Sequence, residues 1–469
     1  MSGADVTCHY LSLCQGRQVH YRRAGAGPPL LMLHPSPQDS QALLPAIARF
    51  AGHFTCIAPD TPGYGLSDDW LGDAPSLRDY ADAIIAFADA LGLDRFYLYG
   101  AATGAQIAVE IGKHHAERLA LVCLDSNGHI DAGTRAAMMA DYFPSVAPRR
   151  DGGHLLTYWD MCRGLFRAFP WNSEDPADRL DLPDLGPEVT QAILLRYLDA
   201  GEGYARAYRP AFGAEDVAHL AGFDAPAVMT RWEGSVVLRL ADAMIAKGLP
   251  ANVRVLHAGA GVDARYGVQL EALLQAQAEH CLPDFTAWPT EICESEGRAW
   301  IGGLHVRQDR SAGGPVRILL HGAGQSCASW GREWPAPDGG HSWVAPDLPG
   351  HGHSPGLEET SLDSLVSALR SAFGAEEVSG YEGVGLGGSC ARQLGGIGTP
   401  LPAAKAPDLS PRTSGAHLVE AWQFAATDPR LAEHQRGFSN PSAVHERACD
   451  LLRAGRDLSR FLALEAGEG

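Results

Sequence analysis

Residues 98–112, LYGAATGAQIAVEIG, have the outline of a strand that passes through a sharp glycine turn into a helix. Turns of this kind can expose a serine for nucleophilic attack at the N-terminus of a helix. The tip of this turn is alanine, and its methyl group cannot attack a substrate. The turn therefore points to chemistry performed by backbone N–H groups, which can stabilise a developing oxyanion without a nucleophile beside them.

Acid–base chemistry has three candidate residues. Asp125 comes directly after an apolar run that we expect to be a strand, Glu233 lies three positions beyond the end of another such run, and His34 follows the run PPLLML. A buried carboxyl at such a strand end is expected to have a raised pKa, which would suit it to proton transfer near neutral pH. We therefore predict Asp125, Glu233 and His34 as the catalytic acid or base.

Short apolar and β-branched runs alternate with helical patterns, which predicts parallel strands joined by crossover helices. A helix is expected at 76–93, and residues 130–222, rich in Trp, Tyr and helix formers, form an insertion that could cover the strand ends as a cap. Seven strands are expected, at 17–23, 29–34, 54–58, 95–99, 119–124, 226–230 and 252–257.

A long internal repeat runs through the chain. The segments CIAPDTPGYGLSD and WVAPDLPGHGHSP match, and the glycine turn returns as GVGLG at 383–387 with Gly385 at its tip. The repeat predicts a first unit at 1–275, a linker at 276–295 and a second, truncated unit at 296–469. The second unit lacks the last strands of the first, so its sheet edge is expected to be covered by the first unit or by another subunit.

Cap side chains are the candidates for the wall of a mainly apolar pocket: His154, Trp159 and Trp171. Packing of the cap itself explains these residues equally well. The pattern GGHLLTYWD at 152–160 returns as GAHLVEAWQ at 415–423, in the truncated unit, which favours the structural interpretation for His154 and Trp159.

Five features occur in a familiar order along the chain: LLMLHPSP, APDTPGYGLSD, the glycine turn, LALVCLD and the cap. Together they resemble the α/β-hydrolase fold, in the branch with a helical cap that includes epoxide hydrolases and haloalkane dehalogenases. The resemblance implies an α/β fold with a mostly parallel, doubly wound sheet and a helical cap, followed by a second, incomplete unit of the same type. It places the nucleophile at Ala102 and Gly385, so neither copy has one.

The same resemblance implies roles for the neighbouring residues. HPSP resembles the HGxP motif, in which Ser36 would offer an oxyanion N–H and Thr103 a second, whereas Pro35 cannot donate. The family histidine is expected near Gly261 or Val262 and is missing. Arg265 could bind a substrate carboxylate, or form a surface ion pair. We expect no cofactor and no metal ligand set.

Charge and composition limit the kinds of molecule that the chain can bind and the compartment in which it is expected. The formal net charge of −19 disfavours nucleic acid and anionic membranes, because their phosphates would repel the chain. Ten cysteines without CxxC spacing indicate buried free thiols in a reducing compartment, and no segment has the length and apolarity of a membrane helix. We therefore expect a cytoplasmic protein with a small-molecule partner.

Three functions remain open at this stage. The preferred one is an enzyme that acts on a small, largely apolar carbonyl, ester or epoxide compound through water attack or a lyase-type step. The alternatives are a ligand-binding descendant that performs no turnover and a structural pseudo-hydrolase. A complete first unit with two carboxylates favours the enzyme.

Overall fold

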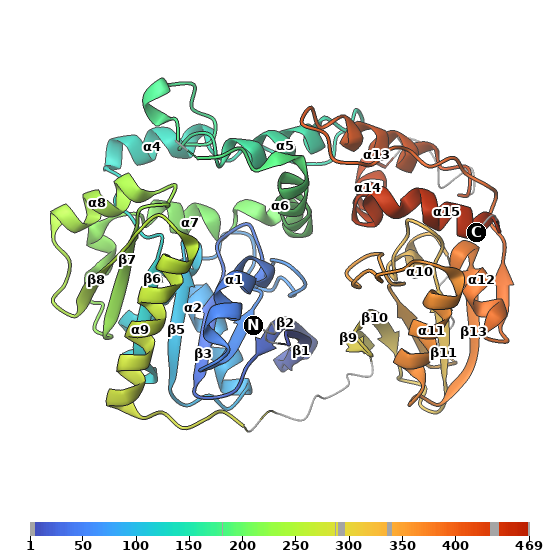
Figure 1. The fold of residues 1–469 in the computed structure, drawn as a ribbon, viewed down its shortest axis with the longest axis horizontal. Coiled ribbons are helices and arrows are strands. Elements are labelled where there is room, and N and C mark those ends of the chain that lie inside the picture. Colours follow the sequence, from blue (N-terminus) through green and yellow to red (C-terminus); the bar gives the residue numbers. More distant parts are fainter. Residues whose placement is uncertain are drawn as a thin grey trace. The chain divides into compact units, whose positions relative to one another are not determined.

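The computed structural model describes residues 5–180, 182–286, 288, 296–334, 340–431 and 440–467, and the chain divides into two compact units (Figure 1). Unit 1 consists of Met1–Ser145, Asp160–Asp184 and Arg196–Ile292. Unit 2 consists of Val146–Trp159, Leu185–Leu195 and Cys293–Gly469. The units thus differ from the division predicted above, because two segments of the cap belong to unit 2.

Unit 1 is built on an eight-stranded sheet in the order β1-β2-β4-β3-β5-β6-β7-β8. The strands are β1 (Thr7–Leu13), β2 (Arg17–Ala24), β3 (Pro29–Leu33), β4 (Thr55–Pro59), β5 (Phe96–Ala101), β6 (Leu119–Asp125), β7 (Ala227–Trp232) and β8 (Val253–Ala258). All pairs from β4 to β8 are parallel, whereas β1 and β2 add antiparallel pairs at one edge. The seven predicted strands and the fold class are confirmed.

The helices of this half of the chain lie where crossover helices and a helical cap were predicted. They are α1 (Leu44–Phe50), α2 (Leu77–Ala90), α3 (Thr103–His114), α4 (Ala132–Asp141), α5 (Gly153–Gly164), α6 (Gly186–Ala200), α7 (Tyr208–Gly213), α8 (Leu238–Lys247) and α9 (Val262–His280). Helix α9 occupies the first residues of the predicted linker, while positions 287 and 289–295 of that linker lie outside the described residues.

The central strands are buried at every position, so helices must cover both faces of the sheet. Leu30 and Met32 of β3 join one buried cluster with Phe50 of α1 and Leu273 of α9. Because successive side chains of a strand point to opposite faces, Leu31, which is also fully buried, must be covered from the other side. The strands are therefore apolar on both faces, as a parallel sheet requires.

Unit 2 has a six-stranded sheet in the order β14-β13-β11-β12-β10-β9. Read from β9, this is the order of the first six strands of unit 1. The strands are β9 (Glu296–Ile301), β10 (Leu304–Asp309), β11 (Val316–Leu320), β12 (Trp343–Pro346), β13 (Val378–Val384) and β14 (Ile397–Thr399), and the helices are α10 (Ser329–Arg332), α11 (Leu362–Phe373), α12 (Gly385–Gln393), α13 (Ala416–Thr427), α14 (Pro441–Ala454) and α15 (Leu458–Ala466). Within the described residues this sheet ends at β14, which agrees with a second, incomplete unit.

Unit 2 also contains the first parts of α5 and α6, and their contacts with α13 and α14 come in matching pairs. Trp159 donates its indole N–H to the carbonyl of Thr413 at 3.0 Å, and Trp422 donates to the carbonyl of Arg150 at 3.2 Å. The ring of His154 lies 5.0 Å from that of Trp422, and the ring of His417 lies 4.9 Å from that of Trp159. The repeated GHL…W pattern thus builds a pseudo-symmetric helix packing.

Candidate functional site

The turn between β5 and α3 has the tight geometry that its sequence predicts. Ala102 stands at the tip with φ +48°, and Thr103 begins the helix. A Cβ on Gly100 would collide with the carbonyl of Gly104, and one on Gly104 would collide with the carbonyl of Leu33. The two glycines are therefore required for the turn to sit against β3. Ala102 thus adopts a strained backbone conformation at this tip, although its side chain has no reactive atom.

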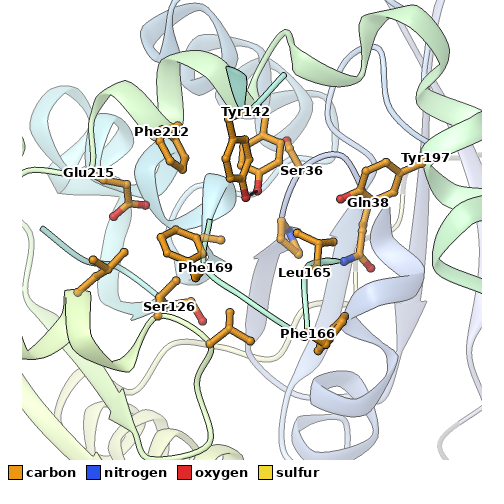
Figure 2. A pocket seen from close by; sticks show the side chains of 16 residues that line it. Ser36, Gln38, Ser126, Tyr142, Leu165, Phe166, Phe169, Tyr197, Phe212 and Glu215 are labelled. Carbon is orange, nitrogen blue, oxygen red and sulfur yellow. Dashed lines mark hydrogen bonds between the residues drawn. The ribbon is translucent and has the colours of Figure 1, made fainter. Parts of the chain in front are cut away.

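A cavity of about 220 Å³ lies at this turn in unit 1 (Figure 2). Its lining is mostly aromatic and aliphatic, and consists of Pro35, Ser36, Gln38, Ala102, Ser126, Tyr142, Leu165, Phe166, Phe169, Tyr197, Tyr208, Phe212, Glu215, Val236, Val237 and Leu240. Ala102 and Ser36 were predicted here from the sequence. An apolar cavity with a few polar groups at one end is typical of small-molecule sites.

Glu215 is the one acidic side chain in this lining. It follows α7, and its Oε2 accepts a hydrogen bond from the N–H of Gly128 at 2.8 Å. Burial raises the pKa of Glu215 to about 7, although the side chain of Gln106 and the N–H of Gly128 act in the opposite direction. A carboxyl group in apolar surroundings that titrates near neutral pH is suited to general acid–base catalysis.

Glu215 could not be predicted, because nothing in its local sequence marks it. It lies in AFGAEDVAHL, where an acidic residue beside Asp216 looks like part of a solvated turn. Its burial comes from α7 and from residues that follow β6, which are nearly ninety positions earlier in the chain, so only the tertiary fold shows it. Gln38 was missed for the same reason, and its Oε1 accepts from Nε of Arg196 at 3.1 Å.

Asp125 lies at the end of β6, as predicted, but its carboxylate takes part in a buried network outside the cavity lining. Its Oδ2 accepts from the phenol of Tyr99 at 2.7 Å, from Nε of Arg265 at 2.8 Å and from the amide of Gln269 at 2.9 Å. Burial, followed by the charge of Asp125, raises the pKa of the Tyr99 phenol. The expectation of a free acid or base at Asp125 therefore has to be corrected.

Arg265 has a structural partner instead of a substrate. Its Nη2 lies 2.7 Å from the carboxylate of Asp125, and its guanidinium stacks 4.6 Å from the ring of Trp232. A guanidinium with this ion pair has its charge already neutralised. The predicted role in binding a substrate carboxylate is not what this geometry supports.

Glu233 and His34 also depart from their predicted roles. Glu233 is exposed in the turn after β7 and is not part of the cavity lining, so the burial expected for this carboxyl group is absent. His34 is fully buried, accepts from the N–H of Thr61 at 2.9 Å and lies 3.1 Å from the carbonyl of Pro35. Burial lowers the pKa of His34, and the neutral ring serves to hold two loops together.

The remaining predicted residues fall into two groups. Thr103 lies beside the cavity with its side chain buried, and as the first residue of α3 its N–H has no partner within the helix. Trp171 packs behind the cavity wall, where its indole N–H donates to the carbonyl of Tyr142 at 2.9 Å. His154 and Trp159 belong to the helix packing of unit 2 and do not line the cavity.

One set of side chains in unit 2 has the composition of a metal site. Donor atoms of His305, Cys327 and Asp347 lie within 4.8 Å of one another, and all three residues are buried. The carboxylate already accepts from Nδ1 of His305 at 2.8 Å and from the N–H of Cys327 at 2.6 Å. His20 and Asp60 make the same pair in unit 1, with Ser40 in place of the cysteine. Hydrogen bonding explains both clusters.

The nine cysteines in the described part of the chain are all free thiols, and six of them are buried. This agrees with the prediction made from their positions in apolar runs. None of the helices in the described residues combines the length and the apolarity that crossing a bilayer requires.

Comparison with known proteins gives a consistent result. A family model described as "Alpha/beta hydrolase family" matches residues 30–288, more than half of the chain. Haloalkane dehalogenase 2 of Mycobacterium tuberculosis is 34% identical over 119 residues, which cover 25% of this chain and 42% of that protein. An (E)-2-((N-methylformamido)methylene)succinate hydrolase of Acinetobacter baylyi is 33% identical over 101 residues, covering 22% and 38%.

Solved structures are similar at lower identity. The structure of E-2-(acetamidomethylene)succinate hydrolase is 20% identical with a TM-score of 0.41, and the match covers 58% of this chain and all of that one. The epoxide hydrolase CorEH is 18% identical with a TM-score of 0.40, covering 59% and 99%. The matched regions span only about two fifths of the length of the curated relatives.

Proposed function

The chain belongs to the alpha/beta hydrolase family, and from this premise we propose that unit 1 is an enzyme that acts on a small, largely apolar carbonyl, ester or epoxide compound without a covalent intermediate. The observation that carries the proposal is Glu215, a carboxyl group with a pKa of about 7 in the wall of an apolar cavity at the Ala102 turn. In this proposal Glu215 takes the acid–base role that the sequence predicts for Asp125, Glu233 or His34.

For an ester, the proposed step is direct attack by water. The carboxylate of Glu215 takes a proton from the water as the water oxygen adds to the carbonyl carbon of the ester. The N–H groups of Ser36 and Thr103 stabilise the oxyanion of the intermediate that forms. Collapse of this intermediate breaks the bond to the alkoxide, which leaves with the proton from Glu215. Water and ester are thereby converted to acid and alcohol with Glu215 restored.

The corresponding turn of unit 2 supports the assignment of these two N–H groups. Ala323 and Leu386 take the places of Ser36 and Thr103 in the repeat, and their N–H groups donate to one carboxylate oxygen at 2.8 and 2.9 Å. This pair of donors therefore can bind a single negatively charged oxygen in the fold that the chain adopts.

Glu215→Gln tests the proposal, with Glu233→Gln as the matched control, because the second carboxyl group is exposed and outside the cavity. Wild-type protein is screened with small esters, epoxides and β-keto acids. For any substrate that is turned over, Glu215→Gln should lower kcat/KM by about a hundred- to ten-thousandfold, whereas Glu233→Gln should leave it unchanged. Full activity of Glu215→Gln would refute the mechanism, and saturable binding without turnover by the wild type would favour the ligand-binding alternative.

The absence of a covalent step has a separate test. A fluorophosphonate probe reacts with activated serine hydroxyls, and Ala102 offers none at the tip of the turn. The purified protein should remain unlabelled by mass spectrometry under conditions that label a serine esterase completely. Stoichiometric labelling would show that a nucleophile elsewhere in the cavity does the chemistry.

A further inference from the structure

The glycine turn of unit 2 is filled by a side chain from the end of the described chain. Gly385, at the tip of this turn, has φ +52°, and Oε2 of Glu465 from α15 lies against it. The same oxygen accepts from the N–H of Leu386 at 2.9 Å and from the N–H of Ala323 at 2.8 Å. A Cβ on Gly385 would collide with this oxygen, so the carboxylate occupies the space where a side chain at the tip would begin.

The second carboxylate oxygen of Glu465 faces a buried cation. Oε1 lies 3.3 Å from Nη1 of Arg430, and the side chains of Glu465 and Arg430 are only 4% and 1% exposed. Arg430 also donates to the carbonyl of Ala323 at 2.7 Å and pairs with Asp428 at 2.6 Å. Two backbone donors and one guanidinium therefore surround the carboxylate of Glu465 in a site closed to water.

Unit 1 differs at the two positions that control access to this site. Pro35 and Ala102 of unit 1 correspond to Gly322 and Gly385 of unit 2. A Cβ on Gly322 would lie 3.2 Å from Oε2 of Glu465, a tight contact, and a Cβ on Gly385 would overlap it. Unit 2 thus has room for a carboxylate at a place where unit 1 presents the methyl group of Ala102 to an open cavity.

We propose that the Ala323 and Leu386 N–H groups, together with Arg430, form a carboxylate-binding site in unit 2, and that Glu465 is its built-in ligand. The site is independent of the proposed chemistry at Glu215. Helix α15 is held to the turn by this interaction, since its Glu465 side chain satisfies donors that would otherwise be buried without partners. Removing the side chain leaves a site that takes a small free carboxylate such as acetate or formate.

The physical basis is the cost of unpaired buried groups. Without Glu465, the N–H groups of Ala323 and Leu386 lose their acceptor and cannot recover it from water when they are enclosed by α15, whereas Arg430 keeps Asp428 and the carbonyl of Ala323. Glu465→Ala should therefore lower the melting temperature of the full chain by roughly 5–10 °C, because two buried N–H donors are left without their acceptor. A free carboxylate that fills the site restores part of this loss, by an amount that grows with the logarithm of its concentration once the concentration exceeds the Kd.

Chemical rescue tests the proposal on the full chain. The melting temperature of Glu465→Ala is measured with increasing sodium acetate or sodium formate, against sodium chloride at equal ionic strength and against acetamide, the neutral analogue of acetate. We expect a rise with acetate or formate that grows with the logarithm of concentration above the Kd and exceeds the rise in wild type, and none with chloride or acetamide. Equal responses of wild type and variant to every additive would overturn the proposal.

Two further variants keep the test decisive. Glu358→Ala removes an exposed glutamate of unit 2 and should melt like the wild type, with no specific response to acetate. If Glu465→Ala does not fold, Glu465→Gln replaces it, because the amide keeps an acceptor oxygen for the two N–H groups but loses the charge and the acceptor oxygen that face Arg430. Glu465→Gln should melt below the wild type, and unchanged melting would refute a charge-specific site.

Discussion

The carboxyl group of Glu215 has a consequence for stability that can be measured without a substrate. Its folded-state pKa of about 7 lies above the ordinary value of 4.5, so the folded protein binds the proton more tightly than the unfolded chain. Stability from this group is complete below the unfolded pKa and is lost as pH rises through the folded pKa. A buried carboxyl group that lowers the stability of the protein at high pH is typical of a functional site.

We therefore predict that Glu215→Gln raises the melting temperature at about pH 8 and leaves it nearly unchanged at about pH 5, where the wild-type carboxyl group is protonated. Differential scanning fluorimetry at the two pH values measures the effect. Glu233→Gln, at an exposed position, should show no such difference. An equal shift of Glu215→Gln at both pH values would mean that the carboxyl group is already ionised at low pH.

Asp125 illustrates the opposite case, a buried charge whose role is structural. Because Asp125 is 1% exposed and pairs with Arg265, Asp125→Asn leaves the guanidinium without a counter-charge. We predict a loss of about 3–5 kcal/mol in the free energy of unfolding, measured by urea denaturation. Asp242→Asn, which breaks the exposed pair with Arg231, should cost less than about 1 kcal/mol. Similar losses for the two variants would contradict a structural role for Asp125.

The sequence predicted those site residues that depend on local geometry. Ala102 and Ser36 are part of recognisable motifs, and both line the cavity. It did not predict Glu215, whose surroundings come from segments that are far apart in the sequence. It also did not predict the ion pair between Asp125 and Arg265. Two residues of opposite charge that meet across 140 positions leave no periodic signal in a single sequence.

At the level of elements, periodicity predicted the buried strands well because central parallel strands are continuous apolar runs. Strand β1 was missed, since TCHYLSL alternates polar residues along an antiparallel edge and has only partial burial. The cap helices were recognised as an insertion, but the repeated GHL…W pattern was needed to indicate their packing. That pattern places a histidine and a tryptophan five positions apart on each of α5 and α13.

The two histidines of this pattern differ in their partners. Nδ1 of each accepts a backbone N–H, from Arg149 in one case and Arg412 in the other, so the neutral ring donates through Nε2. His154 donates to Nδ1 of His445 at 2.9 Å, whereas His417 donates to Oε1 of Gln191 at 3.0 Å. Burial, assisted by neighbouring positive charges, lowers the pKa of both His154 and His445 to about 4.

A histidine whose folded-state pKa is lowered binds protons mainly in the unfolded chain. Between the ordinary value of 6.5 and about 4, falling pH therefore destabilises the packing of α5 against α14. His445→Gln copies the Gln191 arrangement and keeps the acceptor while removing one titrating ring. We predict a smaller drop in melting temperature between about pH 7.5 and about pH 5 for His445→Gln than for the wild type.

The control for this prediction is His53→Gln, because His53 is exposed and its replacement should leave the pH dependence of melting unchanged. If His445→Gln and the wild type lose the same number of degrees on acidification, the His154–His445 contact does not control the acid sensitivity of unit 2.

Over the whole molecule, the compact units do not follow the order of the chain. Unit 2 takes residues 146–159 and 185–195 from the first half, and these segments supply Trp159 and Gln191 to the packing of α13 and α14. The repeat in the sequence predicted two units but not this exchange, since the pattern gives the elements and not which of them pack together. A subunit that covers the open edge of the second sheet remains a prediction.

Residues 296–469 expressed alone should therefore be insoluble or molten. The fragment lacks the segments that cover Trp422 and His417, which are 1% and 0% exposed in the full chain, so their apolar surroundings would face water. It also keeps β14 as a short edge strand, with Ile397 73% exposed. Thermal melting followed by near-ultraviolet circular dichroism measures the outcome, and co-expression of residues 1–295 as a separate chain should recover soluble material. A cooperative transition in the isolated fragment would show that unit 2 folds without residues 146–159 and 185–195. These two segments would then not be needed for its stability.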